Sequence, residues 1–339
     1  MRKFQFLLFI ALFPTLISCG GSSGSDGPRY KLEPILEELA YPIRVSQLPS
    51  GSLVYAELLT GYIYEYDQAN SKKNVLATFP PATNELAGIS GLLVDDNLQN
   101  NHFLFVYYYN PEKRRNVVSR VTVGPIVKKE DIFTAEQASG HNGGGMVQDE
   151  NGIIYLGIGD GDSSEQVNSL ATKLGKIVAF NRNGISMTAN SIIAQGLRNP
   201  FGLTQLAGNI FIADNGPECD DEVNLLKLGQ DFGWGLNYSC GDASTSLAGS
   251  IFSWSKSEGL TDLLGIQSSK ISDFNNSLIL SRFTSNTIVV LKLKNQGTEI
   301  ESEKAIFTNS DHGPFIDFHQ NDLGEIIVTT PNSILKIVE

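Results

Sequence analysis

The sequence is poor in charge and in basic residues, and each shortage excludes a class of protein. Only 18% of its 339 residues are charged, whereas 41% are hydrophobic. This balance excludes a disordered, collagen-like or coiled-coil chain. Lys and Arg number 25 against 37 Asp and Glu, which leaves a formal net charge of −12. Because phosphate binding requires basic surfaces, the deficit argues against a nucleic-acid partner and favours small or neutral ligands.

Cysteine is also scarce, with three residues, Cys19, Cys219 and Cys240. No CxxC or mixed Cys/His spacing is present, which argues against a structural zinc site. If Cys19 is modified, as argued below, the other two form an even pair. In an oxidising compartment such a pair predicts a disulfide, with two buried free thiols as the alternative.

The first 18 residues have the pattern of an export signal. Two basic residues precede an apolar run from Phe4 to Ile17, which is too short and, with Pro14, too interrupted for a lasting membrane helix. The run leads into the letters LISCG, which resemble a bacterial lipobox. The resemblance implies cleavage before Cys19 and attachment of lipid to its thiol. An ordinary signal with a chance cysteine is the alternative.

A flexible tether follows the predicted lipidation site. Residues 20–28 are rich in Gly and Ser, as flexible linkers are. Gly20 is not an Asp, so the inner-membrane retention signal known for such lipoproteins is missing. We therefore expect an exported protein anchored by lipid to the bacterial outer membrane. Its parts would be a signal peptide (1–18), a lipidated tether (19–30) and one folded domain (31–339).

One strand-like pattern recurs six times in that domain. Each copy has a turn residue followed by a short apolar, β-branched or aromatic run. The turn residues are 48 to 68 positions apart and are Gly51, Asn101, Gly152, Gly208, Asn276 and Gly324. No window shows a long apolar period of 3.6 residues, so little helix is expected. Six units of about 50 residues predict an all-β fold, a six-bladed β-propeller with four-stranded antiparallel blades.

Two further points concern this architecture. A β-sandwich would explain the strands and turns but not six similar spacings. In a propeller the first and last segments must pair, because an open ring would leave long strand edges. We expect Ile43–Leu48 to complete the last blade and close the ring.

Three polar, glycine-containing segments hold the candidate chemistry. They are GHNGGG at 140–145, GLRNPFG at 196–202 and DNGPECDDEVN at 214–224. A propeller arranges the loops from one strand end around its central channel. A histidine, an Arg-Asn pair and a Gly-Pro carbonyl pair from neighbouring blades are therefore expected to converge on one ligand.

Together with LGKIVAFNRNG at 174–184, these segments resemble the soluble glucose/sorbosone dehydrogenase family of quinoprotein propellers, from about Leu39 to Val338. The resemblance implies a six-bladed propeller that uses pyrroloquinoline quinone (PQQ) and Ca²⁺. It implies oxidation of an aldose at C1 to a lactone, with electrons passed to an external acceptor.

The resemblance also implies roles for single residues. His141 matches the family's general base, a task that suits imidazole. Arg198 matches the arginine beside the quinone carbonyls, and Asn199 matches a cofactor-contacting amide. Gln166 matches a polar contact to sugar or cofactor. Gly216 and Pro217 match the residues whose backbone carbonyls bind Ca²⁺, a cation that prefers oxygen ligands.

Acidic residues provide further candidate calcium ligands. Asp220, Asp221 and Glu222 are consecutive, and Glu222 is taken as a metal ligand, although a solvated acidic loop is the alternative. Asp160 and Asp162 have a spacing that suits Ca²⁺, but no bidentate acid follows at the spacing of a calcium loop.

The sequence departs from the family where cofactor contacts are expected. The family's Gln, three Arg and Lys are replaced at five positions, namely Ile89, Gly145, Phe283, Pro314 and Ile316. The quinone carries three carboxylates, and each lost base removes a contact of ~1.5–3 kcal/mol. The departures motivate a second hypothesis, a cofactor-less propeller that binds a glycan or protein. A lactonase-type hydrolase is a third, and it would need a divalent metal held by carboxylates in the channel.

Overall fold

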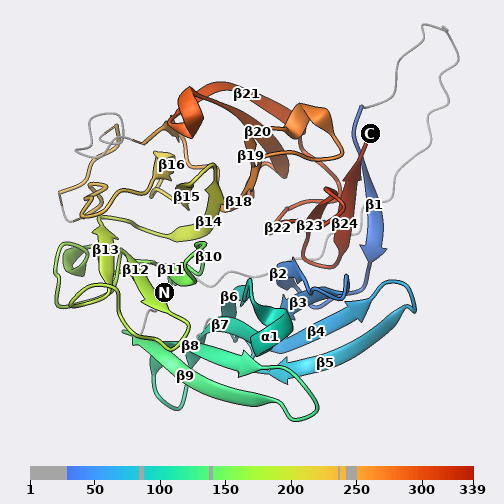
Figure 1. The fold of residues 1–339 in the computed structure, drawn as a ribbon. Coiled ribbons are helices and arrows are strands. Elements are labelled where there is room, and N and C mark those ends of the chain that lie inside the picture. The colour runs from blue at the N-terminus through green and yellow to red at the C-terminus, as the bar shows by residue number, and fades with distance from the viewer. Residues whose placement is uncertain (1–28, 84–87, 137–139, 236, 242–249) are drawn as a thin grey trace, which may run out of the picture.

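The computed structural model describes residues 29–83, 88–136, 140–235, 237–241 and 250–339. Six four-stranded antiparallel sheets surround a central axis, as Figure 1 shows, which confirms the predicted propeller. The predicted signal peptide, Cys19 and the tether as far as residue 28 lie outside the described residues. No described helix is long and apolar enough to cross a membrane.

Blades 1 to 3 follow one another along the chain, each running from its inner to its outer strand. Blade 1 contains β2 (Pro42–Gln47), β3 (Leu53–Glu57), β4 (Tyr62–Asp67) and β5 (Lys72–Thr78). Blade 2 contains β6 (Ile89–Val94), β7 (Phe103–Asn110), β8 (Arg115–Thr122) and β9 (Lys128–Ala135). Blade 3 contains β10 (Met146–Gln148), β11 (Ile153–Ile158), β12 (Lys176–Asn181) and β13 (Ile192–Gln195).

The remaining blades complete the ring. Blade 4 contains β14 (Pro200–Leu206), β15 (Asn209–Asp214), β16 (Asp221–Leu225) and β17 (Phe252–Trp254). Blade 5 contains β18 (Leu260–Ile266), β19 (Ser277–Arg282), β20 (Thr287–Lys294) and β21 (Glu299–Phe307). Blade 6 contains β22 (Phe318–Gln320), β23 (Ile326–Thr329), β24 (Ile334–Val338) and β1 (Lys31–Leu36). Short helices are α1 (Leu98–Asn101), η1 (Ser164–Gln166), η3 (Ser272–Phe274) and η4 (Asn295–Gly297).

The six repeated runs of the sequence form the second strand of each blade. These strands are β3, β7, β11, β15, β19 and β23. They lie between an inner and a third strand, and most of their side chains are buried between neighbouring blades. A fully buried Val, Leu, Ile or Phe side chain stabilises the fold by about 1.5–3 kcal/mol, so the repeat is the main source of stability that the pattern identifies.

The ring closes through a different strand from the one expected. β1 pairs with β24, from Lys31 opposite Val338 to Leu36 opposite Ile334. The expected segment, Ile43–Leu48, instead forms most of β2, the inner strand of blade 1, so that prediction was wrong. The physical reason lies in burial, because β2 begins with four buried residues whereas β1 is largely exposed. Pro34 in β1 cannot donate a backbone hydrogen bond and suits an outer edge.

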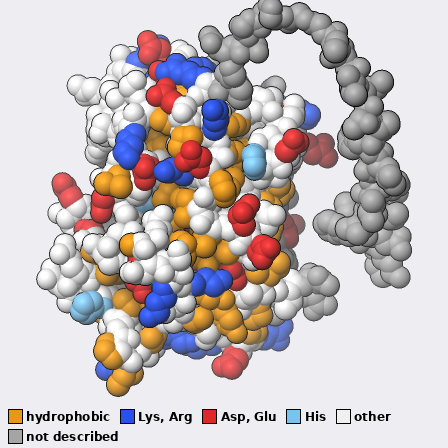
Figure 2. Space-filling view, turned by 90° about the vertical axis from the view of Figure 1, so that its right-hand side faces the viewer, with side chains coloured by type: hydrophobic (Ala, Val, Ile, Leu, Met, Phe, Trp, Pro, Cys, Tyr) orange, Lys and Arg blue, Asp and Glu red, His pale blue; other side chains and the backbone are white. Residues whose placement is uncertain are grey.

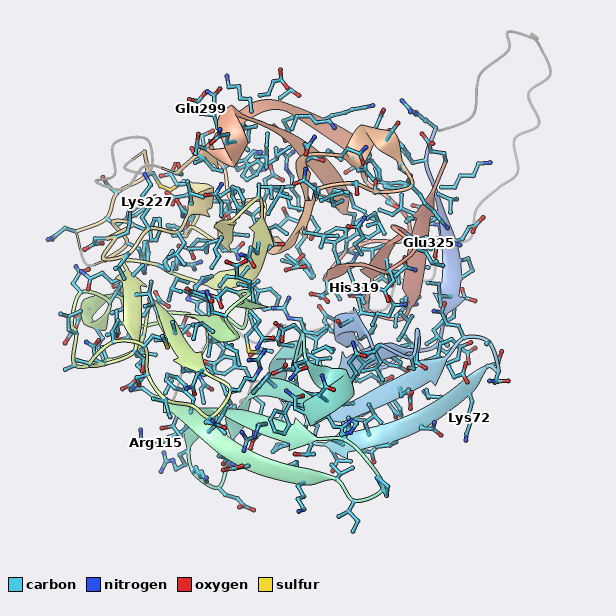
Figure 3. The ribbon with its side chains drawn as sticks, in the orientation of Figure 1. Lys72, Arg115, Lys227, Glu299, His319 and Glu325 are labelled. Carbon is cyan, nitrogen blue, oxygen red and sulfur yellow. A yellow bond between two sulfur atoms is a disulfide. The ribbon has the colours of Figure 1, made fainter. Side chains whose placement is uncertain are left out.

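Charged side chains lie mainly at the periphery. In Figure 3 the labelled Lys72, Arg115, Lys227 and Glu299 lie at the rim, whereas His319 lies beside the central axis. Acidic, basic and apolar side chains are interspersed on the face in Figure 2. The inner strands therefore decide the chemistry of the channel, and the loops at one end of the blades decide the site.

Candidate functional site

Loops from blades 2, 3 and 4 meet at one end of the propeller. The connection from β9 to β10 carries His141, and the connection from β11 to β12 carries Asp160 and Asp162. The connection from β13 to β14 carries Arg198 and Asn199. The loops that sequence analysis singled out are thus neighbours in space.

His141 lies between two acids and an arginine. Its Nδ1 is 2.9 Å from Oδ1 of Asp160 and 2.9 Å from Oδ1 of Asp162. Its Nε2 is 2.9 Å from Nη2 of Arg198. A guanidinium only donates hydrogen bonds, so Nε2 is the acceptor and the proton resides on Nδ1. The ring is thereby held with a lone pair on Nε2, the state that a general base requires.

Asp160 is the residue that orients this imidazole. Its carboxylate, 3% exposed, also accepts hydrogen bonds from Nε1 of Trp234, at 2.9 Å, and from the backbone N–H of Asp162. Burial alone would raise the pKa of Asp160, but the hydrogen bonds from His141 and Trp234 more than offset it, so the pKa is lowered. Asp160 is therefore an anion at neutral pH. Sequence analysis considered it only as a calcium ligand and missed Trp234 as its partner.

Glycines permit the close approach of the two loops. A Cβ on Gly159 would clash with the carbonyl oxygen of His141, and one on Gly143 would clash with that of Gly157. Gly140 stands where soluble glucose dehydrogenases have an acid. A Cβ there would clash with Oδ2 of Asp162, whose carboxylate fills that space.

Arg198 is held by backbone carbonyls. Its Nη1 donates to the carbonyl oxygens of Asn215, at 3.1 Å, and Gly216, at 2.7 Å. Its guanidinium lies 5.7 Å from the ring of Trp234. Asn199 contributes differently, because its Oδ1 accepts the N–H of Gly143 and so ties the Arg198 loop to the His141 loop. The structure thus brings His141, Arg198 and Asn199 together.

Asp214 fixes the backbone of the arginine loop. Its two carboxylate oxygens accept the N–H groups of Arg198, at 3.0 Å, and Asn199, at 2.7 Å. Burial raises the pKa of Asp214 to about 8, and the charge of Glu222 acts in the same direction. Asp214 is a positioning residue that sequence analysis missed, although it directly precedes the Asn-Gly-Pro turn.

The expected calcium ligands are only partly available. The carbonyl of Gly216 faces the guanidinium of Arg198, and a cation bound there would be repelled. Pro217 lies in the same turn. Asp221 already accepts four hydrogen bonds, from the backbone of Gly216, Glu258 and Gly259 and from the hydroxyl of Ser257. Neither Gly216 nor Asp221 therefore has an oxygen free of donors to offer.

Glu222 fits a cation better. Its carboxyl is buried and accepts Nδ2 of Asn224, whose Oδ1 is buried without a hydrogen-bond partner. Burial raises the pKa of Glu222 to about 7, and the charges of Asp220 and Asp221 add to the rise. Within the described ranges, His141, Asp160 and Asp162 form a group of three side chains that could hold a metal, and residues 220–222 do not.

The disulfide is confirmed and the free-thiol alternative is wrong. Cys219 and Cys240 are bonded, with their Cα atoms 5.8 Å apart. The bridge closes the segment that carries Trp234, so it restrains the residue that contacts both Asp160 and Arg198.

Gln166 is the predicted contact that the structure leaves aside. It lies in η1, on the same connection as Asp160, with its side chain exposed. No hydrogen bond within the described part of the chain joins its side chain to His141 or Arg198.

The departures from the family are part of the packing. Ile89 and Ile316 are buried in one apolar cluster, and a Cβ on Gly145 would lie 2.7 Å from the backbone nitrogen of Leu203. Phe283 is 37% exposed. Its neighbour Arg282 pairs with Glu303 of the outer strand β21, so this cation is directed away from the channel.

Comparison with known proteins identifies the family. The family model described as Glucose / Sorbosone dehydrogenase matches residues 39–338. The chain belongs to this family. The aldose sugar dehydrogenase YliI of Escherichia coli (strain K12) is 23% identical over 225 residues, 58% of this chain and 60% of that protein. Quinoprotein glucose dehydrogenase B of Acinetobacter calcoaceticus is 23% identical over 244 residues, 59% and 51% of the two chains. The alignments thus span less than two thirds of these relatives.

Solved structures show the same fold. An oxidoreductase (glucose dehydrogenase) of Thermus thermophilus has a TM-score of 0.81 at 19% identity, covering 91% of this chain and 100% of the other. The PQQ-bound aldose sugar dehydrogenase of Streptomyces coelicolor has a TM-score of 0.79 at 17% identity, covering 92% and 99%. Family membership supports a function like that of the sugar dehydrogenases.

Proposed function

We propose that this chain is a PQQ- and calcium-dependent dehydrogenase that oxidises an aldose at C1 to a lactone and passes the electrons to an external acceptor. One observation carries the proposal, the imidazole of His141 held between Asp160 and Arg198 with its lone pair on Nε2. A base in this state, on a propeller of this family, suits removal of a hydroxyl proton from a sugar.

The residues of the chain divide the work as follows. The C1 hydroxyl would replace Arg198 as the partner of Nε2, and His141 would take its proton. Bound PQQ would supply the acceptor for the hydride that leaves C1, so that two electrons and one proton are removed together with the second proton on His141. Asp160 would stabilise the imidazolium because its own lowered pKa keeps it ionised.

Arg198 would remain in place during this exchange. The carbonyl oxygens of Asn215 and Gly216 hold its Nη1 independently of His141. A fixed cation beside the reacting atoms stabilises developing negative charge without reorganisation. Asn199, which is bonded to the His141 loop, would keep the two loops at a constant distance.

The residues present fit the reactive side of PQQ, because base and guanidinium are preorganised there. The carboxylate side is poorer, since buried Ile316 and Ile89 stand where the family has polar contacts. We therefore expect PQQ to bind more weakly than a complete set of cations would allow. For Ca²⁺, the carboxyl of Glu222 and the unpartnered Oδ1 of Asn224 are the oxygens that suit it.

The test is a titration of the purified mature protein with PQQ, by calorimetry and absorbance, with and without Ca²⁺. Dye reduction with a panel of aldoses follows. The proposal expects saturable binding and sugar-dependent dye reduction that His141→Asn abolishes. Absence of both binding and dye reduction would sink it.

A second candidate is a cofactor-less propeller that binds a glycan or protein. The observation that favours it is the engagement of the Gly216 carbonyl by Arg198 together with the apolar residues at the cofactor side. It expects no thermal shift with PQQ, but quenching of Trp234 fluorescence by a sugar in the absence of PQQ. Quenching that requires PQQ would contradict it.

The lipid anchor is a separate proposal. It rests on the LISCG letters around Cys19, which lie outside the described residues. Metabolic labelling with a fatty acid should mark the wild type but not Cys19→Ala, and the variant should leave the membrane fraction. Labelling of the variant would show that the cysteine is not the site.

A further inference from the structure

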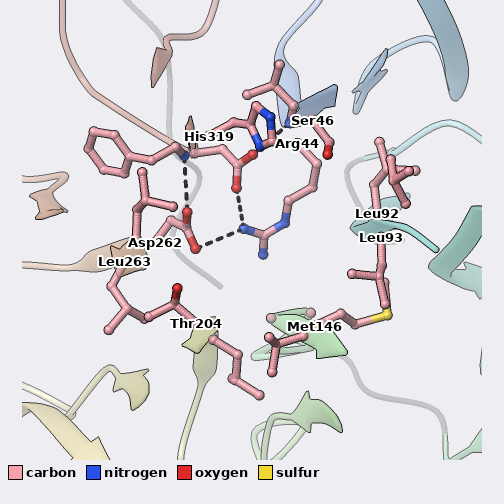
Figure 4. A pocket seen from close by; sticks show the side chains of 18 residues that line it. Arg44, Ser46, Leu92, Leu93, Met146, Thr204, Asp262, Leu263 and His319 are labelled. Atoms are coloured by element: carbon pink, nitrogen blue, oxygen red, sulfur yellow. Dashed lines mark hydrogen bonds and ion pairs between the residues drawn. The ribbon is translucent and has the colours of Figure 1, made fainter. Parts of the chain in front are cut away.

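The central channel is crossed by one buried arginine. The inner strands of all six blades line a cavity of about 210 Å³, and Arg44 of β2 extends into it, as Figure 4 shows. Arg44 is 5% exposed. Two carboxylates, from Asp262 of β18 and from Asp317 just before β22, face its guanidinium from blades 5 and 6.

All three guanidinium nitrogens have partners. Nη1 is 2.8 Å from Oδ1 of Asp317 and 3.6 Å from Oδ1 of Asp262. Nε donates to the carbonyl of Ser90, in blade 2, at 2.9 Å, and Nη2 donates to that of Phe201, in blade 4, at 2.7 Å. One side chain of blade 1 thus contacts four other blades.

The two acids are fixed in their turn. Oδ2 of Asp317 accepts the N–H of Val45 at 2.6 Å, and Oδ2 of Asp262 accepts that of Phe318 at 3.1 Å. Burial raises the pKa of both carboxyls, and the charge of Asp317 raises that of Asp262 further. Two acids share one cation here, and the guanidinium lies where a lactonase-type mechanism would need a divalent metal.

Both backbone partners of Arg44 adjoin the candidate site. A Cβ on Gly144, in the loop of His141, would clash with the carbonyl oxygen of Ser90. The loop therefore rests directly on the atom to which Nε of Arg44 donates. Phe201 is two residues after Asn199, and its ring lies 4.5 Å from the guanidinium of Arg44. The same side chain therefore fixes the lower ends of both loops.

We propose that Arg44 is a positioning residue that sets the distance between His141 and Arg198 from below and closes the channel beneath them. The rigid fork of its guanidinium matters, because a lysine ammonium on a flexible stem does not present the same planar set of donors to Ser90, Phe201 and Asp317. The inference goes beyond the proposed function, since it concerns the protein without any cofactor. It therefore stands or fails separately.

The test is nitrogen NMR of histidine side chains in the purified mature protein. The chain has four histidines, and His141→Asn assigns the signal of interest. The wild type should show Nδ1 protonated and Nε2 unprotonated. Arg44→Met alone leaves two buried acids without a cation and should lower the unfolding midpoint by roughly 5–10 °C.

A triple variant separates positioning from stability. Arg44→Met with Asp262→Asn and Asp317→Asn removes the network as a whole, which buried networks often tolerate. Its unfolding midpoint should return to within about 3 °C of the wild type, while the His141 signal should shift to a mixture of tautomers. Arg44→Lys, which keeps the charge, should give the same mixture and serves if the triple variant does not fold.

Arg182→Met is the matched control. Arg182 also joins two blades, through Asp95 and Asp96 near the opposite end of the strands. It should lower the unfolding midpoint without changing the His141 signal. A wild-type His141 signal in both the triple variant and Arg44→Lys would overturn the proposal, as would an equal change in Arg182→Met.

Discussion

Blades 3 and 4 differ sharply from blades 5 and 6 at the end that carries the candidate site. The former present polar loops that are hydrogen-bonded to one another, through His141, Asp160 and Arg198. The latter present apolar side chains, of which Ile316 is 1% exposed and part of the core. The difference teaches that the proton-transfer half and the anion-binding half of a site can diverge independently, because they lie on different blades.

The largest expected effect is on the polar half. His141→Asn should lower sugar oxidation by about 10²–10⁴-fold, because it removes the only base assigned to the C1 hydroxyl proton. PQQ binding measured by calorimetry should change little. His312→Asn, at an exposed position, is the control and should leave the rate unchanged. Equal rates in wild type and His141→Asn would remove His141 from the mechanism.

The disulfide should contribute the next largest effect. Cys219 and Cys240 are 21 positions apart, and the double change to Ser should lower the free energy of unfolding by about 3 kcal/mol. Denaturant titration followed by Trp fluorescence measures this. Because the bridge restrains Trp234, sugar oxidation should fall as well. A loss of stability with full activity would show that the bridge does not position the site.

Glu222 should make stability depend on pH and Ca²⁺. Its folded-state pKa is raised from 4.5 to about 7, so the stability that it contributes is present below about pH 4.5 and lost as the pH rises through 7. The loss amounts to roughly 2–3 kcal/mol, and Ca²⁺ should restore it at about pH 8 but not at about pH 5.

Glu222→Gln should abolish this calcium effect in a thermal-shift measurement. Glu299→Gln, at an exposed position of β21, should keep it. Asp214, with a pKa of about 8, should leave a residual pH dependence in both variants. A calcium effect that persists in Glu222→Gln would place the ion elsewhere.

The smallest effect tests the apolar half directly. Phe283 is 37% exposed and stands where the family has a Lys, so Phe283→Lys should be tolerated and should tighten PQQ binding about tenfold. Phe283→Leu is the uncharged control. Ile316→Arg, by contrast, should unfold the protein, because it buries an unpaired charge. Unchanged PQQ affinity in Phe283→Lys would show that this blade does not face the cofactor.

The fold was predictable because its signal is local. Turn residues such as Gly51 and Asn276 precede strands whose alternation is written in adjacent residues, and six copies specify the number of blades. The closing strand was not predictable in the same way. Both β1 and β2 read as strands, and only burial distinguishes an exposed edge strand from an inner one.

The site was predictable in part. Its loops were identified from glycine-rich letters that resemble a family, and His141, Arg198 and Asn199 do meet. Asp160 and Trp234 were not identified as partners, since 74 positions separate them and nothing local indicates their hydrogen bond.

The sequence alone thus determined the class of fold, the number of blades and the cysteines that bond, because these follow from periodicity and from chemistry encoded by residue type. Tertiary structure alone decided which nitrogen of His141 accepts a hydrogen bond, which way the carbonyl of Gly216 faces and what occupies the channel. The contacts responsible join residues as far apart as Arg44 and Asp317, 273 positions along the chain. Such pairs form only when the ring closes, so no local pattern encodes them.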